Sequence, residues 1–333
     1  MAADLANLGK HHRLLFSIPL EPVQGKRFQS TGFPGLGAAT FQTRDGPCLL
    51  VESAQSTANR LEKVVWDDAA EDVVGELKGL SHVRVVRGKQ KTFLTDTILE
   101  AHRLNSPYLL ENSKKDFFEG LKKDLDQPEG GPIDRRKLAA AILKYDVGSL
   151  LHGVFLAKKE LAGGRLRVAR ALSGFIEADG VRVAPSGGVK NDHVNPSGDT
   201  KTGFGNVPFA RDEFTADRIA LYVNLDLAQI RGYGLGVAVE RLLILLSLWK
   251  LRALLSGGLR LRTACDLAPS NGVMKATNAE FHLPEIAETQ DALKKAIGEV
   301  GKSMTVTTVS YDDELKTKDE QDKGGEEGEG DDE

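Results

Sequence analysis

Hydrophobic and polar positions along the chain predict a mixture of strands and helices. Alternation or short β-branched runs predict strands over residues 13–20, 48–51, 83–86, 219–227, 259–264 and 304–310, and β-rich stretches over 149–157 and 165–178. Helical spacing of apolar residues predicts helices starting at Ser53 and Asp134, and over 96–103, 113–125, 235–255 and 285–300. Because strands and helices do not alternate regularly, we expect an α+β fold and not a doubly wound sheet.

Residues 181–212 are set apart by frequent glycine and proline and by few apolar positions. Such a segment cannot bury a core of its own, which predicts an extended hairpin or a projecting loop. From Lys158 to Arg211 the chain holds nine basic and five acidic residues. A basic finger with apolar tips suits a nucleic-acid strand. A solvated insertion would have the same composition.

Composition indicates an ordinary globular protein with an unusual C-terminal end. The chain has 333 residues, 41% hydrophobic and 28% charged, which excludes collagen-like, coiled-coil and wholly disordered classes. Its length allows about two domains, or one core with insertions. Residues 312–333 carry twelve acidic residues and three lysines, so a net charge of −4 becomes +5 for residues 1–311. A disordered acidic tail on a mildly basic body is typical of polyanion binders, and equally of a solvating tail.

Localisation signals are weak in this sequence. Cys48 and Cys265 are far apart, and the longest apolar run, 242–249, is too short to span a bilayer. We therefore expect a cytoplasmic protein in a reducing compartment.

Catalytic and metal-binding motifs are not recognisable. None of the seven histidines has a partner at helical i, i+4 spacing, and Gly301-Lys302-Ser303 lacks the first glycine of a phosphate-binding loop. Ser247 and Lys250 have a Ser-x-x-Lys spacing, but they lie in an apolar helix where core packing explains them better. We therefore predict no metal and no cofactor.

Several segments combine basic, amide and hydroxyl side chains with glycine, as phosphate- and base-contacting surfaces do. Each can also be explained structurally, by anchoring aromatics, helix capping or solvation. The residues predicted to contact a nucleic acid are Lys26, Arg27, Gln29, Ser53, Gln55, Asn59, Arg60, His102, Arg103, Asn105, Arg167, Lys190, His193, Lys201, Phe204 and Tyr233.

Five segments together resemble a known family. RFQSTGFPGLGAATF, LLVESAQSTANRLE, ILEAHRLNSPYLLE, SLLHGVFLA and ARALSGFIEA are similar to the CRISPR-associated backbone subunit of type I-U (I-G) Cascade complexes, in the RAMP superfamily. The resemblance runs from about residue 10 to 310 and leaves the acidic tail outside.

This resemblance implies one RRM-like, ferredoxin-like palm over residues 1–311, with inserted fingers near 66–146 and a thumb hairpin near 181–213. Copies would polymerise along one CRISPR RNA and present its spacer for pairing with target DNA. Expected partners are other copies, a large subunit and repeat-end-binding subunits, without a membrane.

We expect no enzymatic activity. Related subunits that cut RNA use an aspartate in the first long loop, whereas residues 21–43 contain none and Asp45 follows in a turn. The alternative is a RAMP-superfamily endoribonuclease that processes repeat RNA, with His102 or His193 as general base. An assembly protein without an RNA role also remains open.

Overall fold

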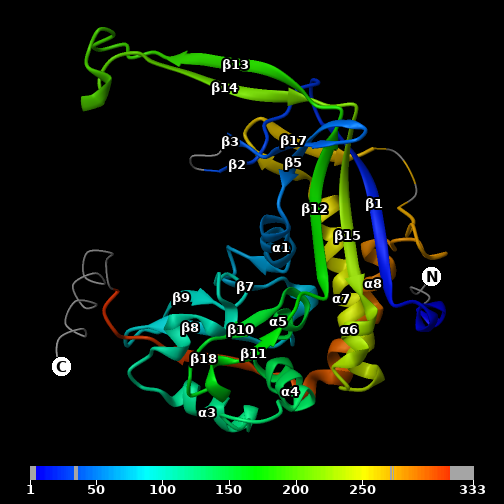
Figure 1. Cartoon of the computed structure of the whole chain (residues 1–333). Helices are drawn as coiled ribbons and strands as arrows, with labels where there is room; N and C mark the ends of the chain where they lie inside the picture. Colours follow the sequence, from blue (N-terminus) through cyan, green and yellow to red (C-terminus); the bar gives the residue numbers. More distant parts are fainter. Residues whose placement is uncertain (1–4, 34–36, 271, 273, 316–333) are drawn as a thin grey trace, which may run out of the picture.

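The structure is a computed structural model that describes residues 5–33, 37–270, 272 and 274–315. Its centre is a seven-stranded antiparallel sheet in the order β16-β17-β1-β15-β12-β5-β4 (Figure 1). The strands are β1 (Arg13–Pro22), β4 (Thr40–Thr43), β5 (Gly46–Glu52), β12 (Leu172–Asp179), β15 (Arg218–Asp226), β16 (Leu259–Arg262) and β17 (Cys265–Pro269). The predicted α+β class is confirmed.

Helices cover this sheet because alternate strand residues are apolar. In β1 the buried positions are Leu14, Phe16, Ile18 and Leu20, all on one face. Helix α1 (Ala54–Lys63) packs on β12. Helix α7 (Val237–Ser256) runs along the sheet, and α8 (Ile286–Val300) packs against α7 (Figure 1). Since α7 has neighbours on several sides, most of its length is buried.

A second lobe lies below the sheet in Figure 1. It contains the three-stranded sheet β18-β8-β9 and a two-stranded ribbon, β10-β11. Strand β18 pairs parallel to β8, with Val306 opposite His82. The elements are β8 (His82–Arg87), β9 (Thr92–Asp96), α2 (Pro107–Leu110), α3 (Asp116–Leu125), α4 (Arg135–Tyr145), α5 (Val147–His152), β10 (Val154–Leu156), β11 (Leu166–Val168) and β18 (Val306–Ser310).

Short elements complete the described chain. They are the strands β2 (Gly32–Phe33), β3 (Gly37–Ala38), β6 (Trp66–Asp67) and β7 (Asp72–Val73), the helix α6 (Leu227–Gly232), and the 3₁₀ turns η1 (Ala6–Lys10), η2 (Gly75–Leu77), η3 (Arg103–Asn105), η4 (Ala162–Gly164), η5 (Thr200–Thr202) and η6 (Gly301–Ser303).

The segment predicted to project does form a long hairpin (Figure 1). Strands β13 (Arg182–Lys190) and β14 (Val207–Thr215) pair from Arg182–Thr215 to Lys190–Val207 and extend away from the body. At the base, Phe28 and Phe214 exchange two backbone hydrogen bonds of 2.9 and 2.8 Å, and the Phe28 ring is buried. The loop before β2 therefore anchors the hairpin.

Two predicted elements are wrong. Residues 96–103 form turns and not a helix, because Asp96 turns the chain through hydrogen bonds to the amides of Ile98, Leu99 and Glu100. Residues 149–152 belong to α5 and not to a strand, and only 154–156 extend. The chain changes direction at Gly153, whose φ of 81° favours glycine.

The other predicted strands and helices are confirmed within a few residues. No helix in the described ranges combines the length and the hydropathy needed to cross a membrane.

Candidate nucleic-acid interface

An open hollow lies between η3, the end of α5 and the ribbon β10-β11. Its volume is about 690 Å³, and we call it the arginine hollow because Arg103, Arg167 and Arg170 line it. His102, Asn105 and His152 complete its polar lining, and none of the described residues around it is acidic. Glu62 lies behind the lining and pairs with Arg103. Arg167 and Arg170 are therefore the guanidinium groups that make the hollow suited to an anion.

The wall of the hollow depends on one close backbone approach. Gly153 connects α5 to β10 with φ 81° and ψ 156°, a conformation almost confined to glycine. A Cβ atom at this position would lie 2.9 Å from the carbonyl oxygen of Val168 in β11. The sequence Leu-His-Gly-Val therefore lets β10 turn sharply and pair with β11 beside the hollow.

Arg103 is fixed by a buried ion pair. Its Nε and one terminal nitrogen donate to the two carboxylate oxygens of Glu62 at 2.5 and 2.6 Å. Both residues are 7% exposed. A bidentate pair of this kind holds the guanidinium plane in one orientation while it neutralises most of its charge.

Arg170 connects the hollow to the start of α1. It donates to the carbonyl oxygen of His152 at 3.3 Å and to the side-chain oxygen of Gln55. Gln55 in turn donates to Asn59 at 3.0 Å, and both amides are exposed. Burial and the neighbouring Arg103 lower the pKa of Arg170. The structure therefore brings the predicted residues Gln55 and Asn59 close to the hollow.

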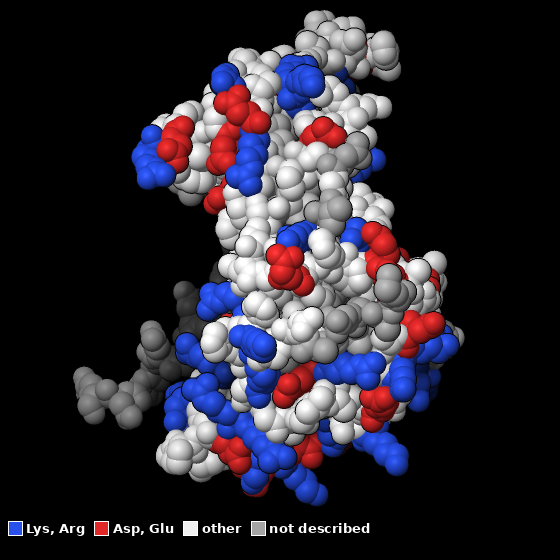
Figure 2. All heavy atoms as spheres, turned by 90° about the vertical axis from the view of Figure 1, so that its right-hand side faces the viewer, with Lys and Arg blue, Asp and Glu red and all other residues white. Residues whose placement is uncertain are grey.

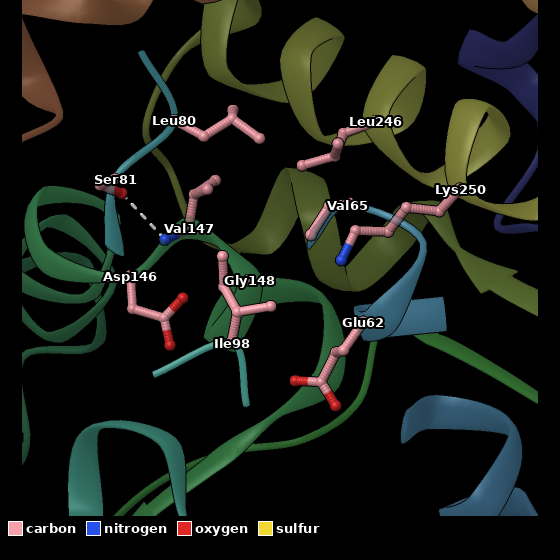
Figure 3. Close-up of a pocket in the computed structure, with 10 residues that line it drawn as sticks. All are labelled: Glu62, Val65, Leu80, Ser81, Ile98, Asp146, Val147, Gly148, Leu246 and Lys250. Carbon is pink, nitrogen blue, oxygen red and sulfur yellow. Dashed lines mark hydrogen bonds between the residues drawn. The ribbon is translucent and has the colours of Figure 1, made fainter. Parts of the chain in front are cut away.

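Behind the hollow lies a small buried cavity of about 20 Å³ (Figure 3). Lys250 enters it from α7, and Glu62 and Asp146 are on its other walls, while Ser81 Oγ accepts a hydrogen bond from the Val147 amide at 2.9 Å (Figure 3). Burial lowers the pKa of Lys250 to about 8 and raises that of Asp146 to about 6. The volume is enough for about one water molecule.

Lys250 also contacts His152. The distance from Lys250 Nζ to His152 Nε2 is 2.9 Å. Burial first, and then the charge of Lys250, lower the pKa of His152 well below its usual value. The lowered pKa favours a neutral imidazole beside Lys250, and the ring's Nδ1 has no hydrogen-bond partner among the described residues.

Four of the predicted residues are in the hollow itself: His102, Arg103, Asn105 and Arg167. Only His102 and Arg167 are exposed. The Asn105 side-chain oxygen already accepts the Ala157 amide at 2.9 Å. Lys26 and Arg27 lie instead in a separate depression at the hairpin base, which Glu213 and Asp266 also line. Nearby, the backbone amide of Gln29 donates to the carbonyl oxygen of Ala264 at 2.7 Å. Lys190, His193, Lys201 and Phe204 are exposed at the far end of the hairpin.

Three predicted residues have structural roles in place of a free surface. The Ser53 hydroxyl caps α1 by accepting the Ser56 amide at 3.2 Å. Arg60 donates to the buried Glu52 at 2.7 Å and to the Leu261 carbonyl at 3.0 Å. Tyr233 is buried, donates to the Leu150 carbonyl at 2.7 Å, and has its pKa raised to about 12 by burial. These bonds do not test RNA contact, which stays a prediction for the three residues.

The face drawn in Figure 2 has a different distribution of charge. In the view from the right of Figure 1, basic and acidic side chains are interspersed, with Lys and Arg more frequent on the lower lobe (Figure 2). Mixed charge of this kind does not single out an anion site. The arginine hollow differs because its described lining residues include no acid.

Sequence reasoning missed His152, Arg170, Phe155, Glu62, Asp146 and Lys250. Arg170 had a local signal, since it follows the candidate Arg167 by three positions in a basic stretch, whereas Phe155 in β10 had none. The buried groups come from positions far apart in the chain, and no spacing connects them. Among described residues, no group of three or more His, Cys, Asp or Glu is arranged to hold a metal ion.

The chain is similar to CRISPR-associated proteins. The family model described as "CRISPR-associated protein GSU0053 (Cas_GSU0053)" matches residues 14–183. A chain of the solved structure "CRISPR RNA-guided surveillance complex, pre-nicking" is similar with TM-score 0.34 and 13% identity, over 82% of this chain and 75% of that chain. Csc2 from Thermofilum pendens is similar with TM-score 0.35 and 11% identity, over 90% and 81%. No curated protein matches the chain.

Proposed function

Since the chain belongs to the family of CRISPR-associated proteins GSU0053, we propose that it is a non-catalytic backbone subunit of a type I Cascade effector complex. Several copies bind one CRISPR RNA and present its spacer to target DNA. Base pairing supplies the sequence specificity, so the protein needs only to hold the RNA backbone in a regular shape. The I-U (I-G) subtype is part of this proposal.

The observation that carries the proposal is the arginine hollow. Arg167 and Arg170 reach it from β11 and the segment after it, with His102 on the opposite rim. Phosphate groups are the anions that arginine recognises best, because two N–H groups can meet two oxygens. Gln55 and Asn59 on α1 extend the polar surface and suit phosphate or ribose contacts.

The hairpin β13–β14 is proposed as the thumb, and the central sheet with α1 and α7 as an RRM-like palm. Residues 66–146 are proposed to correspond to the fingers, and residues 312–333 are proposed as the acidic tail. Lys190, His193, Lys201 and Phe204 at the far end of the hairpin, with Lys26, Arg27 and Gln29 at its base, are proposed to contact RNA. The RNA they contact would extend beyond the arginine hollow or be shared with a neighbouring copy.

The absence of nuclease activity is part of the proposal. Asp45 is highly exposed on a turn, where Arg44 Nε lies 3.2 Å from its carboxylate. The Asp45 carboxylate is paired with its neighbour Arg44 and lies on an exposed turn. It is therefore poorly placed to hold a reacting water molecule. Cleavage of target RNA by the assembled complex that Asp45→Ala abolishes would contradict this assignment.

One observation favours the alternative, an endoribonuclease that processes repeat RNA. His102 is exposed and lines the arginine hollow, so a general base would stand beside groups able to stabilise a phosphorane. His193 on the hairpin has no comparable surroundings among the described residues. Cleavage is the readout that separates the two functions. His102→Ala in a nuclease abolishes the trimming of repeat RNA, whereas a backbone subunit trims no RNA with or without His102.

The deciding experiment is purification from cells that express a CRISPR array, with and without companion proteins. We expect large particles with uniform spacer-containing RNA. The double variant Arg167→Ala/Arg170→Ala should reduce bound RNA. Arg44→Ala, an exposed arginine on the β4–β5 turn, is the matched control and should not.

Two results would reject the proposal. A monomer without RNA that trims repeat RNA would identify the processing enzyme. A monomer that does neither would leave the chain without an RNA role.

A further inference from the structure

The ribbon β10-β11 exposes a single pair of side chains. Val154 and Leu156 in β10 are buried, whereas Phe155 between them is 46% exposed. Phe155 pairs directly with Arg167, the exposed residue at the centre of β11. Because side chains alternate between the faces of a strand, Phe155 and Arg167 stand together on the outer face of the ribbon.

The two side chains form a cation–π pair, which we call the Phe155–Arg167 platform. The guanidinium carbon of Arg167 lies 5.0 Å from the centroid of the Phe155 ring. Three other cation–π pairs occur in the described part of the chain, on Phe93, Tyr145 and Tyr222, and those rings are buried or half-buried. The Phe155–Arg167 platform is therefore a partly apolar and positively charged surface open to solvent.

Its position beside the arginine hollow gives the platform a chemical meaning. Phe155 and Arg167 both line the hollow, and Arg170 is its other guanidinium group without a carboxylate partner among the described residues, since Arg103 pairs with Glu62. A nucleotide has an anionic phosphate, which suits the arginine side chains, and a flat base, which suits the Phe155–Arg167 platform. Nucleobases stack on aromatic rings and on guanidinium planes, and phosphates pair with arginine.

We propose that the Phe155–Arg167 platform stacks one unpaired base of the strand whose phosphate occupies the arginine hollow. This inference rests on the proposed function and adds to it the form of the ligand. The ligand is single-stranded nucleic acid with one base turned toward the protein. A duplex is excluded, because both faces of each internal base are already covered by its neighbours.

The test uses the full chain and a fluorescein-labelled oligouridine, with 5-iodouridine in place of uridine for ultraviolet cross-linking. Phe155→Leu keeps an apolar side chain of similar reach but removes the ring. We expect its affinity to fall about 5- to 100-fold, the range for loss of one stacked base. Phe155→Trp, which keeps an aromatic ring, should bind the oligouridine as the wild type does. Cross-linked peptides from the wild type should contain Phe155.

Two controls sharpen this experiment. Phe41→Leu removes another exposed ring, 37% exposed on the edge strand β4, and should leave affinity unchanged. Salt separates stacking from charge: the fold-loss from Phe155→Leu should be equal at low and high salt, whereas the loss from Arg170→Ala should shrink as salt rises.

Several outcomes would overturn the inference. If Phe155→Leu binds oligouridine as the wild type does and lowers only the melting temperature, the ring merely packs the ribbon. If it loses a companion protein and keeps its RNA affinity, the platform is a protein contact. In both cases the proposed function survives. If neither the wild-type chain nor its assembled complex binds RNA, both proposals fail.

Discussion

The buried pair of Arg103 and Glu62 is expected to stabilise the fold strongly. Arg103→Leu would leave the Glu62 carboxylate buried without its two hydrogen bonds. Removal of one member of such a pair costs about 3–5 kcal/mol. Urea denaturation monitored by circular dichroism measures this loss.

The matched control is Arg182→Leu, which breaks an exposed bidentate pair with Asp217. Exposed pairs contribute little, so its urea midpoint should stay close to that of the wild type. Equal midpoints for Arg103→Leu and Arg182→Leu would show that the buried pair does not hold the lobe together.

The buried carboxyl group of Asp146 is expected to make the stability of the fold depend on pH. Burial raises its pKa in the folded protein to about 6, above roughly 3.9 in the unfolded chain. The folded state therefore binds this proton more tightly, so stability falls as the pH rises from about 4 to about 6. Asp146→Asn removes this penalty and can still accept from Ser149. Its free energy of unfolding relative to wild type should rise by about 3 kcal/mol between pH 4 and 7.

Asp124 provides a control of opposite sign. Partial burial opposes ionisation, but hydrogen bonds from Lys144 and Tyr145 outweigh it and lower the pKa of Asp124. Its contribution to stability is present above the unfolded pKa and is lost at lower pH. Asp124→Asn should therefore lose stability relative to wild type as the pH rises. Parallel curves for Asp146→Asn and wild type would contradict the assignment for Asp146.

At the scale of residues, sequence reasoning identified the exposed parts of the interface better than the buried ones. His102 and Arg167 could be found because polar and basic residues in short irregular segments have few structural uses. Glu62 and Lys250 could not, because their partners lie 41 and 98 positions away. Such pairs form only when the tertiary fold brings the segments together.

At the scale of elements, the cap of α1 separates a structural role from RNA contact. Ser53→Ala removes the acceptor for the Ser56 amide and should cost about 1 kcal/mol in urea denaturation. Ser53→Asp keeps a capping oxygen and should keep most of the stability, but its charge would repel a phosphate. If Ser53 contacts RNA as predicted, Ser53→Asp should lose RNA affinity while its stability is retained. Unchanged RNA affinity in Ser53→Asp would limit Ser53 to its role as the cap of α1.

Most elements were predictable where the hydrophobic period was long. Helices α7 and α8 and strands β1 and β15 have eight or more residues, and each has a clear pattern. Helix α5 and strand β10 have six and three residues and join at Gly153. An apolar run that switches from helix to strand within ten residues has no single period, so its sequence alone could not divide it.

At the scale of the whole molecule, the acidic tail begins with residues that belong to the fold. Asp312 accepts the Gly88 amide at 2.8 Å and pairs with Lys114 at 2.6 Å. Asp313 accepts the amide and hydroxyl of Ser113 at 2.8 and 2.6 Å. The function of the tail is therefore best tested by a chain that ends at Leu315.

We expect this shortened chain to bind random RNA more tightly than the full chain, because residues 316–333 carry nine acidic residues and three lysines. The difference should shrink as salt rises. Filter binding at two salt concentrations measures it. A chain that ends at Tyr311 is the comparison, since it also loses the Asp312 and Asp313 contacts and should unfold more easily. Unchanged affinity in the chain ending at Leu315 would reject an electrostatic role for the tail.

The parallel pairing of β18 with β8 has a consequence for synthesis. Val306 lies opposite His82, 224 positions earlier in the chain. Until the ribosome has synthesised β18, strand β8 can pair only with β9. One edge of β8, which carries three valines, is then without a partner strand. Proteins that stop short of residue 306 cannot close it, and such edges promote aggregation. A chain that contains β18 therefore covers this edge of β8, and a chain that lacks β18 leaves it exposed.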